Sequence, residues 1–398
     1  MAAVAIRGTT YPVVLPKLRD PRLHLAATIT SLQVLGQVAF HFRLSIPQIL
    51  VSLVTCAVIE VAIAVRQQHV LMWPASALLT GNGVAFVLRV PGMRHGDWWS
   101  FRDWWLFAAV AGGSLLSKHL IKWKGEHVFN PSNIGLVLCF LLLGRAHAEP
   151  LDFWWGPMSW WMAFALAIIV TGGFTILRRL KLLRVALTFW ATFAAGLGIL
   201  ALAGHEMTAR WHLGPLRGFD LWWVLITSPE VLVFLFFMIT DPKTAPPGGR
   251  ARVLYAASLG LLAALLIAPT RSEYAAKVAL LSALAVVCAV KPFLVYVPRR
   301  RLLVAAAAAA VAYPLALVAV GNGPDRAAAA PRAGSTVPVT ILPSRGVQTQ
   351  LDRSTANAIA RGLLASVPAP AGAHVAVHLE PGAGLAAPVA VAQLAGRT

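Results

Sequence analysis

Long apolar segments alternate with short polar breaks along most of the chain. Each segment is close to the roughly 20 residues that a helix needs to cross a bilayer. The pattern predicts about eleven helices, over residues 23–42, 46–65, 70–90, 103–121, 128–144, 158–177, 185–203, 221–240, 253–268, 276–297 and 302–320. The predicted fold class is an all-α polytopic membrane protein with about 10–11 transmembrane helices.

The composition agrees with this pattern. Hydrophobic residues make up 58% of the chain and charged residues only 12%, whereas ordinary soluble domains have about 25% charged residues. The formal net charge is +19. The basic residues lie between apolar segments and form no continuous patch, so they indicate membrane topology and not a nucleic-acid surface. The predicted surroundings are a lipid bilayer.

The distribution of Lys and Arg predicts the orientation. With the N-terminus in the cytoplasm, nineteen basic residues fall on the inner side and nine on the outer side, up to residue 320. Cytoplasmic loops carry the excess of basic residues in membrane proteins. The count therefore predicts a cell-membrane protein with residues 1–22 as a basic cytoplasmic arm. Eleven crossings would place the C-terminal tail outside the cytoplasm.

The composition changes after the last predicted helix and divides the chain into regions. Residues 23–320 are the predicted transmembrane bundle, and residues 321–336 are a Pro/Gly/Ala linker. Residues 337–398 read as a small extracytoplasmic α+β appendage and tail, with strands at TVPVTILPS and AHVAVHL around a helix at LDRSTANAIARGLLASV. So short a region is marginal for an independent core, which favours either a partner protein or partial disorder.

Tryptophans gather on the predicted outer side. Eleven of them fall there: Trp98, Trp99, Trp104, Trp105, Trp154, Trp155, Trp160, Trp161, Trp211, Trp222 and Trp223. An aromatic belt at the membrane interface is the favoured interpretation. The alternative is a surface that covers a planar cofactor or anchors a partner protein.

Two helices in opposite halves of the chain begin or break at proline. Asn130-Pro131 and Ser228-Pro229 stand 98 positions apart, each ahead of an apolar run. The predicted topology gives the two helices opposite directions, which is typical of inverted repeats whose half-helix N-termini face a site near the membrane midplane. Asn130, Ser132, Ser228 and Glu230 would then line one shared cavity. The alternative is two ordinary proline-started helices.

These segments also resemble a known family. FNPSNIGLVL and the later FFMITDPKTAPPGGRARVLYA resemble two related membrane proteins, RnfD of the Rnf electron-transport complex and NqrB of the sodium-pumping NADH:quinone oxidoreductase. MWPASALLTGNGVAF and TSPEVLVFLFFMITDPKT are most similar to the UnbU-type membrane proteins of enediyne biosynthesis. The likeness covers about residues 20–300. It implies two inverted five-helix repeats that bind flavin and pass electrons within a membrane complex.

One departure from the family concerns how the flavin is attached. The electron-transport proteins carry a Ser-Gly-Ala-Thr type motif whose Thr holds FMN covalently. The loop over residues 204–220 has no such motif, and Thr208 stands in MTAR. We therefore expect FMN or riboflavin to be bound without a covalent bond.

Charged and hydroxyl side chains within or beside the apolar segments are the remaining candidates. Glu60 and Glu230 lie inside predicted helices, where a carboxylate is costly and marks either a functional group or a structural hydrogen bond. Thr240, Asp241 and Lys243 belong to TDPKT, which either contacts a cofactor or simply ends a helix. No catalytic residue and no metal site is predicted, since the cysteines lie on separate segments.

The sequence leaves two functions open. The first is a membrane electron-transport subunit that binds flavin and works with a partner oxidoreductase, in enediyne natural-product biosynthesis. Its partners would be membrane or periplasmic proteins. The second is a transporter or export component that uses the same inverted-repeat fold without a redox cofactor.

Overall fold

The computed structural model describes residues 3–6, 9–17, 20–151, 159–209, 212, 215–294, 312–319, 339–342, 374–380 and 389–395. Its helices are α1 (Pro21–Ala39), α2 (Ile46–Gln68), α3 (Ala75–Val87), α4 (Trp104–Leu120), α5 (Pro131–Leu143), α6 (Trp160–Leu180), α7 (Leu183–Leu202), α8 (Gly218–Thr227), α9 (Pro229–Val233), the π-helix η1 (Phe234–Met238), α10 (Gly249–Ile267) and α11 (Glu273–Leu294). Within the described residues, six helical segments are long and apolar enough to cross a membrane. The all-α polytopic fold is therefore confirmed.

The predicted eleventh helix falls mostly outside the described residues. Of residues 302–320, only 312–319 are described, and these are helical. The predicted linker, 321–336, lies wholly outside the described residues.

The predicted break at Pro229 is present. Ser228 has an extended backbone (ψ 142°) between α8 and α9, and its Oγ accepts a hydrogen bond from the Val231 N–H at 3.2 Å. Proline cannot donate the hydrogen bond that would continue α8 into α9, while it suits the first turn of a new helix. The segment Gly218–Met238 is thus one membrane-length unit, made of α8 before the break and of α9 and η1 after it.

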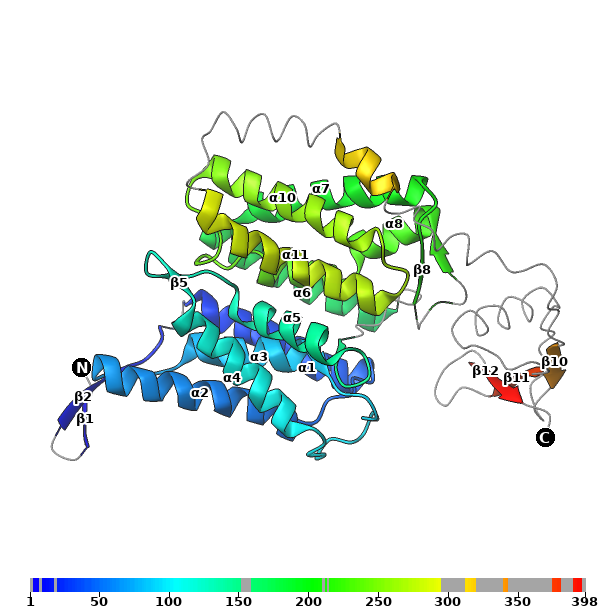
Figure 1. Ribbon diagram of the computed structural model, residues 1–398. Coiled ribbons are helices and arrows are strands. Elements are labelled where there is room, and N and C mark those ends of the chain that lie inside the picture. Colours follow the sequence, from blue (N-terminus) through cyan, green and yellow to red (C-terminus); the bar gives the residue numbers. More distant parts are fainter. Residues whose placement is uncertain are drawn as a thin grey trace.

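The helices pack in the same order in each half of the chain, as Figure 1 shows for the blue-to-cyan and green-to-yellow halves. In the first half α2 packs on α4, and α4 on α5; in the second half α7 packs on α10, and α10 on α11. The two halves meet where α1 contacts α6 and where α5 contacts α11. Equivalent helices therefore face each other across the boundary, as expected of two five-helix repeats.

This packing corrects one part of the repeat predicted from the sequence. The segment after Pro229 packs against α6 as α3 packs against α1, so its counterpart is α3, which follows Pro74. The helix that begins at Pro131 corresponds instead to α11. Pairing Pro131 with Pro229 was wrong because both prolines start helices, a local preference that carries no information on position within a repeat.

Glycines allow helices to approach each other closely in each half. A Cβ at Gly81 of α3 would lie 2.5 Å from the carbonyl oxygen of Ser52 in α2. A Cβ at Gly260 of α10 would lie 2.8 Å from the carbonyl oxygen of Phe189 in α7. Because the atoms met are backbone atoms, no side-chain movement could make room. Small residues at such crossings are typical of membrane helices, which gain little from apolar burial against lipid.

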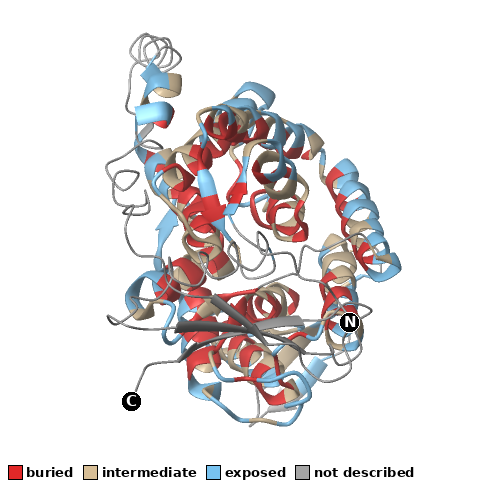
Figure 2. Cartoon of the chain, turned by 90° about the vertical axis from the view of Figure 1, so that its right-hand side faces the viewer, coloured by how far each residue is buried: buried red, intermediate tan, exposed pale blue. Residues whose placement is uncertain are grey.

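Buried residues line the inside of both halves, coloured red in Figure 2. The larger core cluster draws on helices from both halves, including Phe107, Phe140, Phe189 and Phe193. A second cluster lies between α1 and α6 and includes Leu32 and Ile169. Large apolar residues also remain exposed on the helices, which suits surfaces that contact lipid.

Short strands join the helix ends. They are β1 (Ala3–Ile6), β2 (Thr9–Val14), β3 (Leu71–Met72), β4 (Leu88–Arg89), β5 (Lys122–Trp123), β6 (Glu126–His127), β7 (Glu149–Pro150), β8 (Glu206–Thr208) and β9 (Pro215–Arg217). The N-terminal arm forms the β1–β2 hairpin, and β2 continues the sheet to β3. No strand was predicted in this arm.

The C-terminal region contains a three-stranded sheet in the order β10 (Val339–Leu342), β11 (His374–Glu380) and β12 (Val389–Ala395). The strands β10 and β11 are parallel and lie where strands were predicted. The predicted intervening helix falls outside the described residues. The expected tail was wrong in part, because it supplies β12, antiparallel to β11.

The orientation in the membrane stays a prediction. A cytoplasmic 178–184 loop (RRLKLLR) and an extracytoplasmic 91–102 loop follow from the basic-residue count. Single cysteines introduced in a cysteine-free background on intact cells should react with a membrane-impermeant thiol reagent at 91–102 and not at 178–184. The reverse labelling would invert the topology.

Candidate functional site

The seven residues predicted to bind a cofactor fall into two groups. Asn130, Ser132, Thr240, Asp241 and Lys243 lie where the loop before α5 meets the end of η1. Ser228 and Glu230 lie at the start of α9.

Asn130 connects the start of α5 with the end of η1. Its Oδ1 accepts hydrogen bonds from the Asn133 N–H at 3.2 Å and from the Ser132 hydroxyl at 3.0 Å. Its Nδ2 donates to the carbonyl oxygen of Met238 at 3.2 Å. The residue is 8% exposed. Asn130 is therefore more than a helix cap, because it also pairs the carbonyl oxygen of the last residue of η1.

The TDPKT segment is tied to neighbouring elements. The Asp241 carboxylate lies 3.1 Å from Nε2 of His127, and Lys243 Nζ lies 2.8 Å from the Glu126 carboxylate. Both partners belong to the β5–β6 hairpin. The Thr240 hydroxyl donates to the carbonyl oxygen of Phe236 at 2.6 Å. These contacts favour the helix-ending role of TDPKT, one of the two roles that the sequence leaves open.

Glu230 lies in a cluster of three charged side chains at the start of α9. Lys277 of α11 places its Nζ 3.1 Å from Glu230 Oε1 and 2.5 Å from Glu273 Oε1. The same Nζ donates to the carbonyl oxygen of Leu151 at 3.0 Å. The three side chains are only 13–18% exposed. Charges held this far inside an apolar bundle are costly and are commonly functional.

The two helix N-termini are separated along η1, which corrects the expectation of one shared cavity. Asn130 contacts Met238, which lies ten positions after Ser228. At about 1.5 Å per residue, ten helical positions span on the order of 15 Å. The start of α5 thus meets the far end of the helix that Pro229 begins, so Asn130 and Ser132 do not join Ser228 and Glu230 at one position.

Glu60 forms a separate buried cluster between α2 and α4. Its carboxylate accepts a hydrogen bond from Lys118 Nζ at 2.8 Å and lies 2.7 Å from His119 Nε2. The three side chains are 11%, 17% and 20% exposed. Because Lys118 and His119 belong to the last turn of α4, the cluster joins the interior of α2 to the end of α4. These contacts fit a structural hydrogen-bonding role for Glu60.

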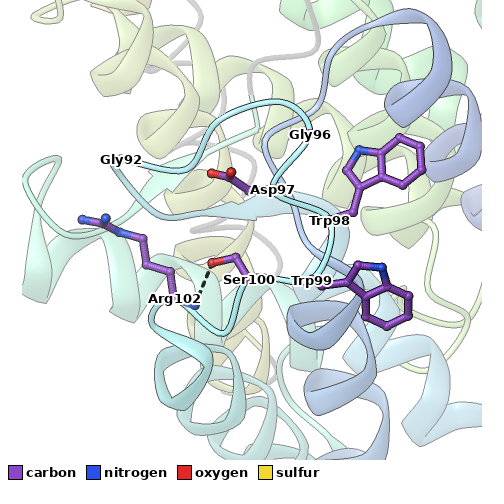
Figure 3. A pocket seen from close by; sticks show the side chains of 7 residues that line it. All are labelled: Gly92, Gly96, Asp97, Trp98, Trp99, Ser100 and Arg102. Atoms are coloured by element: carbon purple, nitrogen blue, oxygen red, sulfur yellow. Dashed lines mark hydrogen bonds between the residues drawn. The ribbon is translucent and has the colours of Figure 1, made fainter.

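An open pocket lies in the loop before α4, within the predicted aromatic region (Figure 3). It has a volume of about 480 Å³ and is lined by Gly92, Gly96, Asp97, Trp98, Trp99, Ser100 and Arg102. The Arg102 N–H donates to Ser100 Oγ at 3.1 Å, which shapes the turn between these two lining residues. Trp99 is 70% exposed. An exposed indole beside a shallow pocket is in keeping with the favoured aromatic belt.

Sequence reasoning missed the partners of the candidate carboxylates. Glu273 and Lys277 are four positions apart at the start of an apolar helix, a spacing that predicts an ion pair. Their proximity to Glu230 depends on the tertiary fold that brings Lys277 of α11 to the start of α9, which a sequence pattern does not contain. Lys118 and His119 were visible as a basic helix end, but not as partners of Glu60.

Asn130 provides a prediction of its own. We expect Asn130→Ala to destabilise the protein by roughly 2–4 kcal/mol, because it removes a helix cap and leaves buried groups without partners. Asn130→Asp keeps the acceptor for the cap and loses only the donor to Met238, so it should cost less. Thermal unfolding in detergent measures both changes. Equal losses of stability in the two variants would mean that the contact with Met238, and not the cap, provides most of the stabilisation by Asn130.

The second half of the bundle matches a known protein family. Residues 144–301 match the NQR2, RnfD, RnfE family. This range begins just after α5 and contains the broken helix, TDPKT and the Glu230 cluster. No curated protein matches the chain significantly. The chain is thus similar to this family over residues 144–301, which form part of its helical membrane fold.

Proposed function

We propose that the protein is an electron-transport subunit that binds FMN or riboflavin non-covalently inside the membrane. The observation that carries the proposal is the Glu230 cluster. It lies at the N-terminus of a helix that starts within a membrane-length segment, inside the part of the chain that matches the family. An electron-transport family favours this function over the transporter alternative.

The hydrogen-bonding groups of this cluster complement those of a flavin ring. The pyrimidine edge of the ring carries one N–H between two carbonyl oxygens. A carboxylate such as Glu230 accepts from the N–H, and an ammonium such as Lys277 donates to a carbonyl. Both side chains are less than a fifth exposed, so hydrogen bonds to them are weakly screened. The positive end of the helix dipole, at the start of α9, adds a potential that favours the electron-rich ring.

The chain would hold the ring and keep water away. Glu273 also pairs with Lys277, which limits the positions that the ammonium can take. The apolar surroundings of α9 and α11, including Val231 and Leu280, exclude water. A bound flavin supplies the ability to accept and release one or two electrons. Electrons would come from a partner oxidoreductase in the membrane or periplasm.

Non-covalent attachment is part of the proposal. Thr208 stands in the β8–β9 hairpin, where its hydroxyl donates to the carbonyl oxygen of Arg271 at 3.0 Å. It lacks the acceptor motif of the covalently flavinylated proteins. We also place the protein in enediyne biosynthesis, on the likeness of MWPASALLTGNGVAF and TSPEVLVFLFFMITDPKT to UnbU-type proteins.

The attachment prediction has a direct test. Acid precipitation of the purified protein should release all bound flavin into the supernatant, since no covalent bond holds it. A fluorescent protein band that survives denaturing electrophoresis under ultraviolet light would contradict non-covalent attachment.

The position of the site has its own test. Glu230→Gln replaces the carboxylate by an amide of similar shape and should lower the flavin content per protein by more than half. The variant should still elute as a monodisperse peak, which shows that it is folded. Lys243→Met is the matched control, because Lys243 is 60% exposed and belongs to the other group. Full flavin content in Glu230→Gln would place the flavin elsewhere.

A further inference from the structure

Arg89 is a buried cation whose hydrogen bonds are incomplete. It ends the short strand β4 after α3 and is 4% exposed. Its Nη1 donates to the carbonyl oxygens of Ala85 and Leu88 at 3.0 and 2.7 Å, and its guanidinium carbon lies 5.2 Å from the centre of the Phe42 ring. Its Nη2 is buried and has no hydrogen-bond partner among the described residues.

No carboxylate balances this charge within the described part of the chain. Glu149 stands opposite Arg89 in the β4–β7 register. Its carboxylate, however, lies 4.0 Å from Arg43 and 3.7 Å from Arg145. Arg43 lies in the same region as Arg89, because its partner Glu149 stands opposite Arg89 in the strand pair, and the two like charges repel each other. Two other guanidinium groups, those of Arg43 and Arg145, therefore already share the one carboxylate that stands opposite Arg89.

A bound anion would stabilise the buried positive charge of Arg89. A guanidinium does not lose its proton in proteins. Burying a charged group without a partner costs several kcal/mol, because water is removed and nothing replaces it. Two carbonyl oxygens and a ring face offset only part of this cost. A negatively charged group beside Nη2 would supply both the missing acceptor and the missing charge.

We propose that Arg89 and Arg43 bind a phosphate-type oxyanion, either free phosphate or the phosphate of a lipid headgroup. The planar fork of a guanidinium matches two oxygens of a phosphate, and such charge-assisted hydrogen bonds are about twice as strong as neutral ones. Arg43 is 43% exposed and Arg89 only 4%, so an anion that arrives from solvent meets Arg43 first. This site is independent of the proposed flavin function.

The test uses the full chain purified in detergent with a zwitterionic lipid, and inorganic phosphate as the probe. Phosphate should raise the thermal midpoint saturably compared with chloride at equal ionic strength. Arg89→Gln should abolish the shift, and Arg43→Gln should raise the half-saturating phosphate concentration about tenfold. Arg66→Gln, a change in a cation at the end of α2, is the control and should leave the shift unchanged.

A lipid arm separates the two sources of phosphate. The anion is a lipid headgroup if three results are found together. Free phosphate gives no shift of the thermal midpoint. Phosphatidylglycerol, unlike phosphatidylcholine, remains bound in native mass spectrometry, and Arg89→Gln abolishes this retention. If neither probe distinguishes wild type from Arg89→Gln, the proposal is overturned. Should Arg89→Gln fail to fold, Arg43→Gln decides, since unchanged phosphate and lipid binding in that variant would also overturn the proposal.

A third variant tests the charge argument itself. Arg89→Met keeps much of the length of the side chain and removes the cation, so without phosphate or anionic lipid it should be at least as stable as wild type. It should show no response to phosphate. A large loss of stability in Arg89→Met under these conditions would mean that Arg89 acts only as an internal hydrogen-bond donor, and would overturn the proposal.

Discussion

Replacing Lys277 by Met is expected to destabilise the protein by on the order of 3–5 kcal/mol, because it leaves two partly buried carboxylates facing each other. Glu230 and Glu273 lie 3.1 and 2.5 Å from the same ammonium, so its removal exchanges two attractions for one repulsion. Thermal unfolding in detergent, followed by the loss of the monodisperse elution peak, measures the change.

Two further variants show whether charge is the cause. Lys243→Met removes an ammonium from a pair with a similar distance, 2.8 Å, but with both side chains at least half exposed. It should cost less than about 1 kcal/mol. Adding Glu273→Gln to Lys277→Met should restore part of the stability, since it removes one of the opposed charges. A double variant no more stable than Lys277→Met would attribute the loss to packing.

Replacing Glu60 by Leu should have the second large effect, again on the order of 3–5 kcal/mol. Lys118 would lose its carboxylate while remaining only 17% exposed, and His119 would lose its partner as well. Glu60→Gln should cost less, because the amide oxygen can still accept from Lys118. The exposed pair Glu126–Lys243 has the same 2.8 Å separation as Glu60–Lys118 and serves as the matched comparison.

Comparing Glu60→Leu with Glu126→Leu tests whether burial determines how much stability is lost. Glu126→Leu removes a carboxylate of the same geometry from a solvated position and should change stability by less than about 1 kcal/mol. Equal losses in Glu60→Leu and Glu126→Leu would show that the cluster between α2 and α4 is as weakly coupled as a surface pair, and that its burial adds nothing.

Much of the fold could be predicted from the sequence, because each membrane helix is determined by the residues of its own segment. The need to satisfy backbone groups without water produces long apolar segments, and these predicted the helices from α1 to α11 within a few residues. The break at Pro229 was also local, since proline and the Ser228 cap act within one turn. By contrast, the pairing of Pro131 with Pro229 failed, because equivalence between repeats depends on packing.

The candidate site was only partly predictable for the same reason. Glu230 stood out as a carboxylate within an apolar run, while its partner Lys277 looked like an ordinary charge near a helix start. Asn130 was identified as a cap from Asn-Pro, but its donation to Met238 joins residues 108 positions apart. Arg89 was counted only as a loop charge, and its burial emerges from the contact between β4 and β7.

The central claim is that this membrane bundle carries a reducible flavin, and an absorption spectrum tests it most directly. The full chain, purified in detergent without added cofactor, should show the absorption bands of oxidised flavin. These bands should bleach on anaerobic addition of dithionite and return when air is admitted, with close to one flavin per chain. A colourless, monodisperse protein that also takes up neither FMN nor riboflavin would contradict the claim.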